Sequence, residues 1–307
     1  MTPTLVLGTR ASTLALAQTR LATKALESAH RGLLVQEKKI RTTGDERLDV
    51  NLSSPGALDK GLFTREIENA LLRGDIHAAV HSLKDLPIEQ PPGLVLAAIL
   101  PRANASDCLA SKHPGGWRGL PERAIVATCS LRRKFQLLRL RPDLNIVDIR
   151  GNIDTRLNKL ADSDFMDALV LATAGLERLG GAVIPEEIQI STIEEMLPAP
   201  GQGAIALQSR EDDSATRDLL ASIHHEPTAR CVNAERELLR QLGGGCGLPL
   251  GTLATIVNGE VHLQAAIFKP GGIMKRLDQS PALFASSNTA ASRPSSPSPT
   301  PSGIPTT

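Results

Sequence analysis

The 307-residue sequence predicts an α/β protein with two similar lobes and a smaller third domain. Short apolar runs of strand length alternate with segments whose apolar residues recur at helical spacing, first before residue 100 and again from about residue 124. This alternation is typical of parallel-rich sheets joined by crossover helices. Near the end, Asn258-Gly259 lies between two β-rich runs and indicates a hairpin, so we expect a small α+β third domain.

The first lobe is expected to begin with a strand at residues 5–7 and a helix capped by Ser12. A second helix is expected from Thr64, with Glu66 and Glu68 favourable in its first turn and Gly74 after its end. The other expected strands of this lobe lie at residues 34–40, 76–80, 94–100 and 204–207.

The second lobe repeats this pattern. A strand at 124–127 is followed by a helix that Ser130 can cap and that Pro142 closes. Further strands are expected at 146–149 and 168–172, with helices around 153–160 and 174–179.

The third domain is expected to contain a helix that begins near Pro227 and ends at Gly243, followed by the hairpin. From residue 278 onward Ser, Pro, Thr and Ala dominate, which predicts a disordered tail. The predicted domains are therefore 1–100 with 204–220, 101–203, 221–277 and the tail 278–307. Two lobes of this kind favour a ligand cleft between them.

Composition narrows the possible partners. The 34 basic and 33 acidic side chains give a net charge of +1, which argues against bulk binding to nucleic acid or a membrane. Aromatic residues are scarce, with one Trp, five Phe and no Tyr, so we expect no aromatic surface on which the bases of single-stranded nucleic acid could stack. No apolar run has transmembrane length, and the start does not resemble a signal peptide. The four cysteines are widely spaced, so we expect no disulfide framework, no metal site and a cytoplasmic location.

The polar stretch His81-Ser82-Leu83-Lys84-Asp85-Leu86-Pro87 directly follows an apolar strand. A Lys beside an Asp at the end of a buried strand costs free energy unless both find partners. Strand ends are also where open α/β folds bind ligands. Lys84 and Asp85 therefore form either a site or a local ion pair.

Arginines gather near the strand ends of the second lobe. Arg binds carboxylates through two parallel hydrogen bonds and stays charged, so several near one cleft indicate a ligand with several carboxylates. Backbone N–H groups near Ser130 could add to such an anion site. Solvated helix faces are the alternative, and we prefer it for Arg139 and Arg141. The turn positions of Arg132, Arg133 and Arg150 favour binding, and Arg156 lies one turn into the next expected helix.

Cys246 follows three glycines, where the backbone can adopt unusual geometry. It is either a nucleophile or covalent attachment point, or an incidental thiol after a helix end. A Cys-dependent hydrolase would need a His within reach, such as His224 or His225. Cys129 and Cys231 are expected to be packed as small hydrophobic side chains.

Nine motifs in order, from about residue 5 to about 270, resemble the porphobilinogen deaminase family, also called hydroxymethylbilane synthases. They begin with Gly8-Thr9-Arg10-Ala11-Ser12-Thr13-Leu14-Ala15, Thr42-Thr43-Gly44-Asp45, Lys60-Gly61-Leu62-Phe63 and the 81–87 stretch. They continue with Ser130-Leu131-Arg132-Arg133, Arg150-Gly151-Asn152, Ala174-Gly175-Leu176-Glu177-Arg178-Leu179, Gly201-Gln202-Gly203 and Gly244-Gly245-Cys246.

The resemblance implies two lobes like those of periplasmic binding proteins, a third domain and a monomer. It implies a transferase of tetrapyrrole (heme or chlorophyll) biosynthesis that joins four porphobilinogen units into hydroxymethylbilane and releases ammonia. A dipyrromethane cofactor would be held by a thioether to Cys246. By family position Asp85 and Lys84 would be catalytic, with Asp85 stabilising cationic pyrroles. The same two residues would contact the cofactor together with Ser82, Thr128, Ser130, Arg132, Arg133 and Arg150. Substrate would be bound by Arg10, Ser12, Lys60, Phe63, Arg150, Arg156, Arg178 and Gln202.

The chain departs from the family pattern at three places. Cys129 stands where a Ser is usual, which removes the stronger hydroxyl hydrogen bond. The loop before Lys60 looks slightly longer and lacks a Lys. After the hairpin the family continues with a further strand and helix, whereas Lys275-Arg276-Leu277 leads into the Ser/Pro tail. A truncated third domain, with weaker cofactor anchoring and reduced activity, is therefore expected.

A non-catalytic two-lobe protein that binds a small polycarboxylate is the alternative function. It would account for the arginines and the cleft. It would not account for the presence of both Lys84-Asp85 and Gly245-Cys246.

Overall fold

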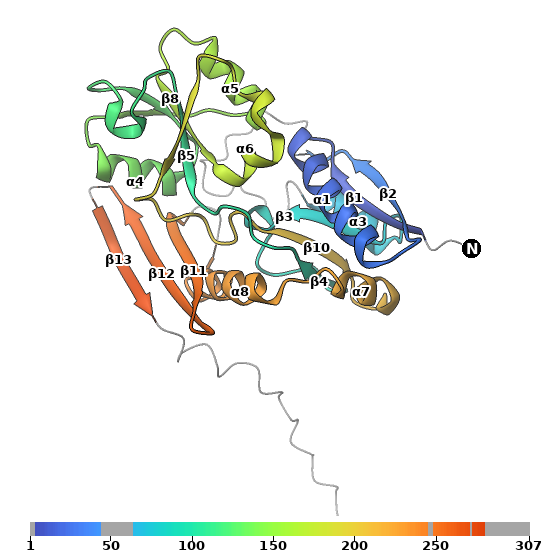
Figure 1. Ribbon diagram of the computed structural model, residues 1–307. Helices are drawn as coiled ribbons and strands as arrows, with labels where there is room; N and C mark the ends of the chain where they lie inside the picture. Colours follow the sequence, from blue (N-terminus) through green and yellow to red (C-terminus); the bar gives the residue numbers. More distant parts are fainter. Residues whose placement is uncertain (1–3, 44–63, 245–247, 271, 280–307) are drawn as a thin grey trace, which may run out of the picture.

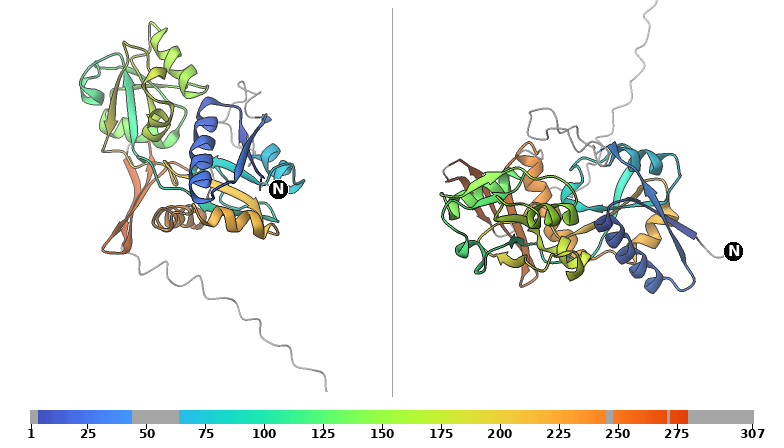
Figure 2. Two further views of the ribbon diagram at one scale, coloured as in Figure 1. Left: turned by 45° about the vertical axis from the view of Figure 1, so that its right-hand side comes forward. Right: turned by 90° about the horizontal axis from the view of Figure 1, so that it is seen from above.

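The computed structural model describes residues 4–43, 64–244, 248–270 and 272–279. These residues form two five-stranded sheets and one three-stranded sheet. Two α/β lobes lie side by side, and the small sheet lies against the second lobe (Figure 1). Figure 2 shows the same arrangement from two further directions.

The sheet of the first lobe has the strand order β2-β1-β3-β10-β4. Strands β2, β1 and β3 are parallel, and β10 runs antiparallel to both of its neighbours. Helices α1 and α7 pack on one face and α3 packs on the other, so both faces are buried, as is typical of parallel-rich sheets. The elements are β1 (Thr4–Arg10), α1 (Thr13–Ala29), β2 (Leu34–Ile40), α3 (Arg65–Leu72), β3 (Ala78–Ser82), the 3-10 turn η1 (Leu83–Asp85), β4 (Leu94–Ile99), β10 (Ile205–Arg210) and α7 (Ser214–Ala221).

The sheet of the second lobe has the order β7-β6-β8-β5-β9. Here β7, β6 and β8 are parallel, and β5 runs antiparallel to both neighbours. Helices α5 and α6 bury one face and α4 buries the other. The elements are β5 (Asp107–Ser111), η2 (Gly116–Gly119), β6 (Ile125–Ala127), α4 (Leu131–Leu140), β7 (Asn145–Val147), α5 (Ile153–Ala161), β8 (Ala168–Ala172), α6 (Thr173–Leu179), η3 (Gly181–Val183) and β9 (Gln189–Ile193).

The chain crosses between the lobes twice, and the two crossing segments lie side by side. The Ala103 N–H donates to the Gly203 carbonyl at 3.1 Å, and the Leu100 N–H donates to the Ile205 carbonyl at 3.0 Å. Gly203 has a φ of +87°, and a Cβ there would lie 2.6 Å from the Ala103 carbonyl oxygen. Only glycine therefore permits this close approach.

The third unit consists of helix α8 (Glu226–Gln241) and the antiparallel strands β11 (Leu250–Val257), β12 (Glu260–Lys269) and β13 (Gly272–Gln279). Leu250, Leu263 and Ile267 bury one sheet face against α8. The other face is packed in part and exposed in part. Ala266 is buried, and a Cβ at Gly251 would lie 2.6 Å from Leu197 Cβ, whereas Gln264 and Arg276 are exposed.

Local sequence signals were confirmed in several places. Ser12 accepts a hydrogen bond from the Ala15 N–H, and Ser130 accepts one from the Arg133 N–H, so both are N-caps. Asn258 and Gly259 have φ values of 52° and 83°, as the predicted type I′ turn requires. The strands predicted at 34–40 and 168–172 were found with these bounds, and the other predicted strands and helices were found with ends shifted by a few residues. Strand β10 forms part of the first sheet, as expected.

Other expectations were incomplete. Strands β5, β9 and β13 and helix α7 were not expected from the sequence. Strand β13 pairs with β12 and adds a third strand to the hairpin. Lys275, Arg276 and Leu277 belong to this strand. Residues 278 and 279, which were expected in the tail, belong to this strand, and 280–307 lie outside the described residues. The domain boundaries at 100, 203 and 220 stay predictions.

Candidate active site

The turn that carries Lys84 and Asp85 projects from the end of β3. Leu83 is fully buried, Lys84 is partly buried and Asp85 is exposed. The Lys84 ammonium donates to Gln202 Oε1 at 3.5 Å. Burial lowers the pKa of Lys84 to about 8, and Asp85 opposes this shift. The strand end therefore presents an exposed carboxylate next to a cation that has lost much of its hydration.

Asp107, at the start of β5, lies at the centre of a buried ion cluster. Its side chain is fully buried, and its two oxygens accept hydrogen bonds from Arg132 Nη1 at 2.6 Å and Arg133 Nη2 at 2.8 Å. Gln202 Nε2 donates to the same carboxylate at 3.0 Å. Burial opposes ionisation of Asp107, but the two guanidinium groups outweigh it and hold the pKa of Asp107 below its usual range.

Through this cluster the structure brings together Lys84, Gln202, Arg132 and Arg133, four of the residues expected from the sequence. Asp107 itself was not expected from the sequence. It stands 25 residues before Arg132 in the chain, and a single acid before a short apolar run gives no local signal for such a pairing.

Arg132 and Arg133 are only 5% and 8% exposed. Besides the bonds to Asp107, Arg132 Nη1 donates to the Leu197 carbonyl at 2.6 Å, and Arg133 Nη1 donates to the Val170 carbonyl at 2.9 Å. Much of their hydrogen-bonding capacity is therefore already directed to the protein. A direct role of these two arginines in binding a carboxylate ligand stays a prediction.

Arg156 and Arg178 each have a hydrogen-bond donor that the described residues leave unused. The Nε atom of each is buried and finds no hydrogen-bond partner among the described residues. Burial lowers the pKa of Arg156 to about 10, and Arg133 adds to this shift while Cys129 and Asp85 oppose it. Arg178 Nη2 donates to the Gly203 carbonyl at 2.6 Å. A carboxylate ligand would supply the acceptor that these guanidinium groups lack.

The smaller predicted contacts have local structural partners. Ser12 and Ser130 cap α1 and α4, Thr128 Oγ1 accepts from the Ser130 N–H, and Ser82 Oγ donates to Gln18 Oε1 at 3.1 Å. Arg10 is the last residue of β1 and is partly buried.

Arg150 follows β7 and is partly buried, and its carbonyl accepts a hydrogen bond from Lys159 Nζ. Lys60, Phe63 and Cys246 lie outside the described residues.

The prediction that Cys129 is packed as a small hydrophobic side chain was wrong. Its side chain is exposed in the loop before α4, and Sγ donates to the Ile149 carbonyl. Residues 128–130 connect a short strand to a helix, so this side chain faces away from the buried layer. The same prediction was confirmed for Cys231, which is buried.

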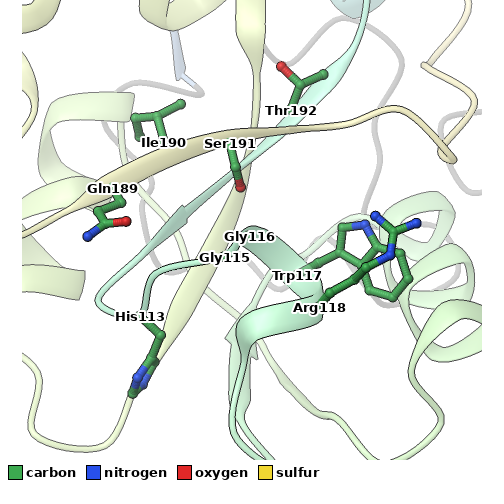
Figure 3. A pocket seen from close by; sticks show the side chains of 9 residues that line it. All are labelled: His113, Gly115, Gly116, Trp117, Arg118, Gln189, Ile190, Ser191 and Thr192. Carbon is green, nitrogen blue, oxygen red and sulfur yellow. The ribbon is translucent and has the colours of Figure 1, made fainter.

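A surface pocket of about 340 Å³ lies in the second lobe, between η2 and β9. Figure 3 shows its lining, which includes His113, Trp117 and Arg118 and none of the predicted site residues. The described residues contain no group of three or more His, Cys, Asp and Glu side chains that could hold a metal ion. Within the same described ranges, no helix is both long and apolar enough to span a bilayer.

Comparison with known proteins gave consistent matches along the chain. Residues 5–218 match the family model "Porphobilinogen deaminase, dipyromethane cofactor binding domain", and residues 229–283 match "Porphobilinogen deaminase, C-terminal domain". The solved structure of the methionine-binding protein MetQ aligns with 76% of this chain and with 94% of the MetQ chain. The sequence identity is 14% and the TM-score is 0.44.

Three curated relatives, each named porphobilinogen deaminase, are similar over most of their length. The protein from Chloroherpeton thalassium is 47% identical over 263 residues, covering 85% of this chain and 82% of the relative. That from Syntrophomonas wolfei is 46% identical over 262 residues, covering 85% and 84%. That from Roseiflexus sp. is 46% identical over 277 residues, covering 90% and 89%. The chain therefore belongs to the porphobilinogen deaminase family.

Proposed function

We propose that this protein joins four porphobilinogen molecules into hydroxymethylbilane and releases one ammonia for each. The observation that carries this proposal is the setting of Asp85, an exposed carboxylate beside the partly buried cation Lys84 and within electrostatic reach of Arg156. Porphobilinogen carries an acetate and a propionate group, which the cations can bind. Its pyrrole becomes cationic when the amine leaves, and an anion can stabilise that charge.

The family's cofactor is a covalently attached dipyrromethane, and the residues present fit such a group. Among the described residues the Lys84 ammonium donates one hydrogen bond, to Gln202, so it has donors left for a carboxylate of the cofactor. When bound, the cofactor supplies the nucleophilic pyrrole to which the new units are added. We assign its attachment to Cys246, with contacts from Lys84, Asp85, Ser82, Thr128, Ser130, Arg132, Arg133 and Arg150.

Asp85 is proposed to act in two ways. Its carboxylate stabilises the cation that remains when ammonia leaves porphobilinogen, because a fixed anion in a partly desolvated cleft needs little reorganisation. It also accepts and returns the proton that is exchanged as the new carbon–carbon bond forms. Lys84 binds a ligand carboxylate through its ammonium group.

Incoming substrate is proposed to be held by the remaining site residues. Gln202 is buried, and its side chain is hydrogen-bonded to both Asp107 and Lys84, so its position beside Lys84 is fixed. We further propose that the protein acts as a monomer in the cytoplasm. The substrate contacts are assigned to Arg10, Ser12, Lys60, Phe63, Arg150, Arg156, Arg178 and Gln202.

The intact mass of the purified chain and its turnover of porphobilinogen test this proposal together. The parent chain should carry the extra mass of one dipyrromethane, release ammonia and form hydroxymethylbilane, and Cys246→Ala should lack the extra mass. A bare parent mass after incubation with porphobilinogen, together with no ammonia release, would contradict the proposal. Tight binding of porphobilinogen without turnover would instead support a binding protein.

A further inference from the structure

Helix α8 contributes an arginine that contacts the backbone of the Lys84–Asp85 turn. Arg236 is only 7% exposed. Its Nη1 atom donates to the carbonyl oxygens of Leu83 at 3.4 Å and Leu86 at 3.0 Å. Its Nη2 atom donates to those of Pro87 at 2.7 Å and Ile88 at 3.3 Å. One guanidinium group therefore holds the chain on both sides of Lys84 and Asp85.

These carbonyl groups are the only partners of Arg236 in the part of the chain that the structure describes, where it forms no ion pair. Burial lowers the pKa of Arg236 to about 10. A buried cation without a carboxylate partner is unfavourable unless hydrogen bonds compensate it. The four carbonyl groups supply that compensation, and hydrogen bonds to a charged donor are stronger than neutral ones. The turn and the guanidinium group thus depend on each other.

Helix α8 is itself fixed by the neighbouring residue. Glu235 is fully buried and forms a two-point ion pair with Arg102 of the first crossing segment, at 2.7 and 3.1 Å. Glu235 also accepts from the Gly201 N–H of the second crossing segment and from the Ala254 N–H of β11, both at 2.8 Å. Arg236 therefore extends from a helix that is anchored to both crossing segments and to the third sheet.

Apolar contacts support the same junction. Leu83 and Leu86 pack with Ala229 and Val232 of α8 in one buried cluster. Apolar packing sets the distance between the turn and the helix but does not fix the direction of the backbone. The directional bonds of Arg236 do so, because a planar guanidinium group fits its acceptors in a defined geometry.

We infer that Arg236 is a positioning residue that holds the Asp85 carboxylate at the angle that the reaction requires. This inference rests on the proposed function of Asp85. Arg236 does not need to touch substrate, since it acts through the backbone of residues 83–88. It also gives α8, which precedes Cys246 in the chain, a direct mechanical link to the catalytic turn.

The test compares Arg236→Met, Arg236→Lys and the matched control Arg240→Met. Arg240 lies one helical turn further along α8, is exposed and pairs only with Glu237 among the described residues. For each variant we would measure kcat and KM, the cofactor mass, the melting temperature and the amide hydrogen exchange of residues 83–88. Strand β8 (Ala168–Ala172) serves as the internal exchange reference.

We expect Arg236→Met to lower kcat roughly 10- to 100-fold, as small misplacements of a reacting group do, with KM changed less than about 2-fold. Exchange should quicken within residues 83–88 and stay unchanged in β8, with the cofactor mass retained. Arg236→Lys should recover part of kcat, because an ammonium group keeps the charge but lacks the planar set of donors of a guanidinium group. Arg240→Met should behave like the parent.

A parent-like kcat in folded Arg236→Met, or exchange that quickens equally in β8, would overturn the inference. If Arg236→Met does not fold, the same two readouts on Arg236→Lys decide the question. If the parent itself does not turn over porphobilinogen, the proposed function fails. The local exchange result would still show whether Arg236 holds the turn.

Discussion

The two lobes have the same strand order but use their strand ends differently. In each sheet three parallel strands are followed by one strand that runs antiparallel to its neighbours. That strand is β10 in the first lobe and β5 in the second, and each directly follows a crossing segment. Ser12 and Ser130 also occupy equivalent positions. Each is the N-cap of the helix that follows the second strand in its sheet, β1 in the first lobe and β6 in the second. Similar topology therefore places polar residues at similar strand ends in both lobes.

The difference lies in how the charges are compensated. In the first lobe Asp85 is exposed at the end of β3, while in the second lobe Arg132 and Arg133 are buried and paired with Asp107. An exposed carboxylate can act on a ligand, whereas a buried and paired arginine mainly fixes the protein around it. The first lobe thus presents the exposed carboxylate that we propose as the reacting group, and the second lobe contains a buried cluster of one carboxylate and two guanidinium groups.

The largest effect is expected from Asp107→Asn, which removes the anion of the buried cluster. Arg132 and Arg133 would remain buried without a charge partner, and breaking such a pair costs about 3–5 kcal/mol of unfolding free energy. Urea unfolding at neutral pH measures this loss. The control is Asp212→Asn, whose side chain is 85% exposed and should change stability by less than about 0.5 kcal/mol. Equal effects of both substitutions would remove the distinction between the lobes.

This comparison also shows what sequence could and could not predict. The caps at Ser12 and Ser130 and the Asn258-Gly259 turn depend on a few adjacent residues, so local chemistry specified them. Strands β5 and β9 carry polar residues such as Asp107, Ser111 and Gln189 at their ends, and β5 pairs with β8 and β9, which lie far along the chain, so no local pattern marked them.

The partners of the site residues could not be predicted either. Asp107 meets its arginines through the packing of β5 and α4 within the second lobe, and Arg236 meets the 83–88 turn across a separation of about 150 residues. Local patterns therefore indicated that Lys84 and Asp85 form either a site or a local ion pair, but they gave no sign of the groups that hold this turn.

The second effect concerns the ammonium of Lys84, whose pKa burial lowers from 10.5 to about 8. The group is charged below this pH and neutral above it, so binding of a ligand carboxylate should weaken as the pH rises through about 8. The pH profile of kcat/KM should show this alkaline limb. Lys84→Arg should move the limb to higher pH, because a guanidinium group keeps its charge. If the alkaline limb of kcat/KM lay at the same pH in the parent and in Lys84→Arg, the ionisation of Lys84 would not be its cause.

The smallest effect is expected from Cys129→Ser in the loop before α4. The side chain is exposed, so stability should change by less than about 0.5 kcal/mol. Its thiol should nevertheless react with an alkylating reagent in the folded protein, while the buried Cys108 and Cys231 should not. Burial around Sγ raises the pKa of Cys129, so labelling should quicken as the pH rises. Peptide mapping after native alkylation would identify the labelled sites, and equal labelling of Cys108 would contradict the placement.

The most direct test of the division between the lobes is the single-turnover rate of porphobilinogen addition in Asp85→Asn, compared with Asp85→Glu. Asparagine keeps the shape but not the charge, so the rate should fall roughly 100-fold or more, while glutamate should keep part of it. The melting temperature should not change, because Asp85 is exposed. A rate in Asp85→Asn close to that of the parent would contradict the account and place the reacting group elsewhere in the cleft.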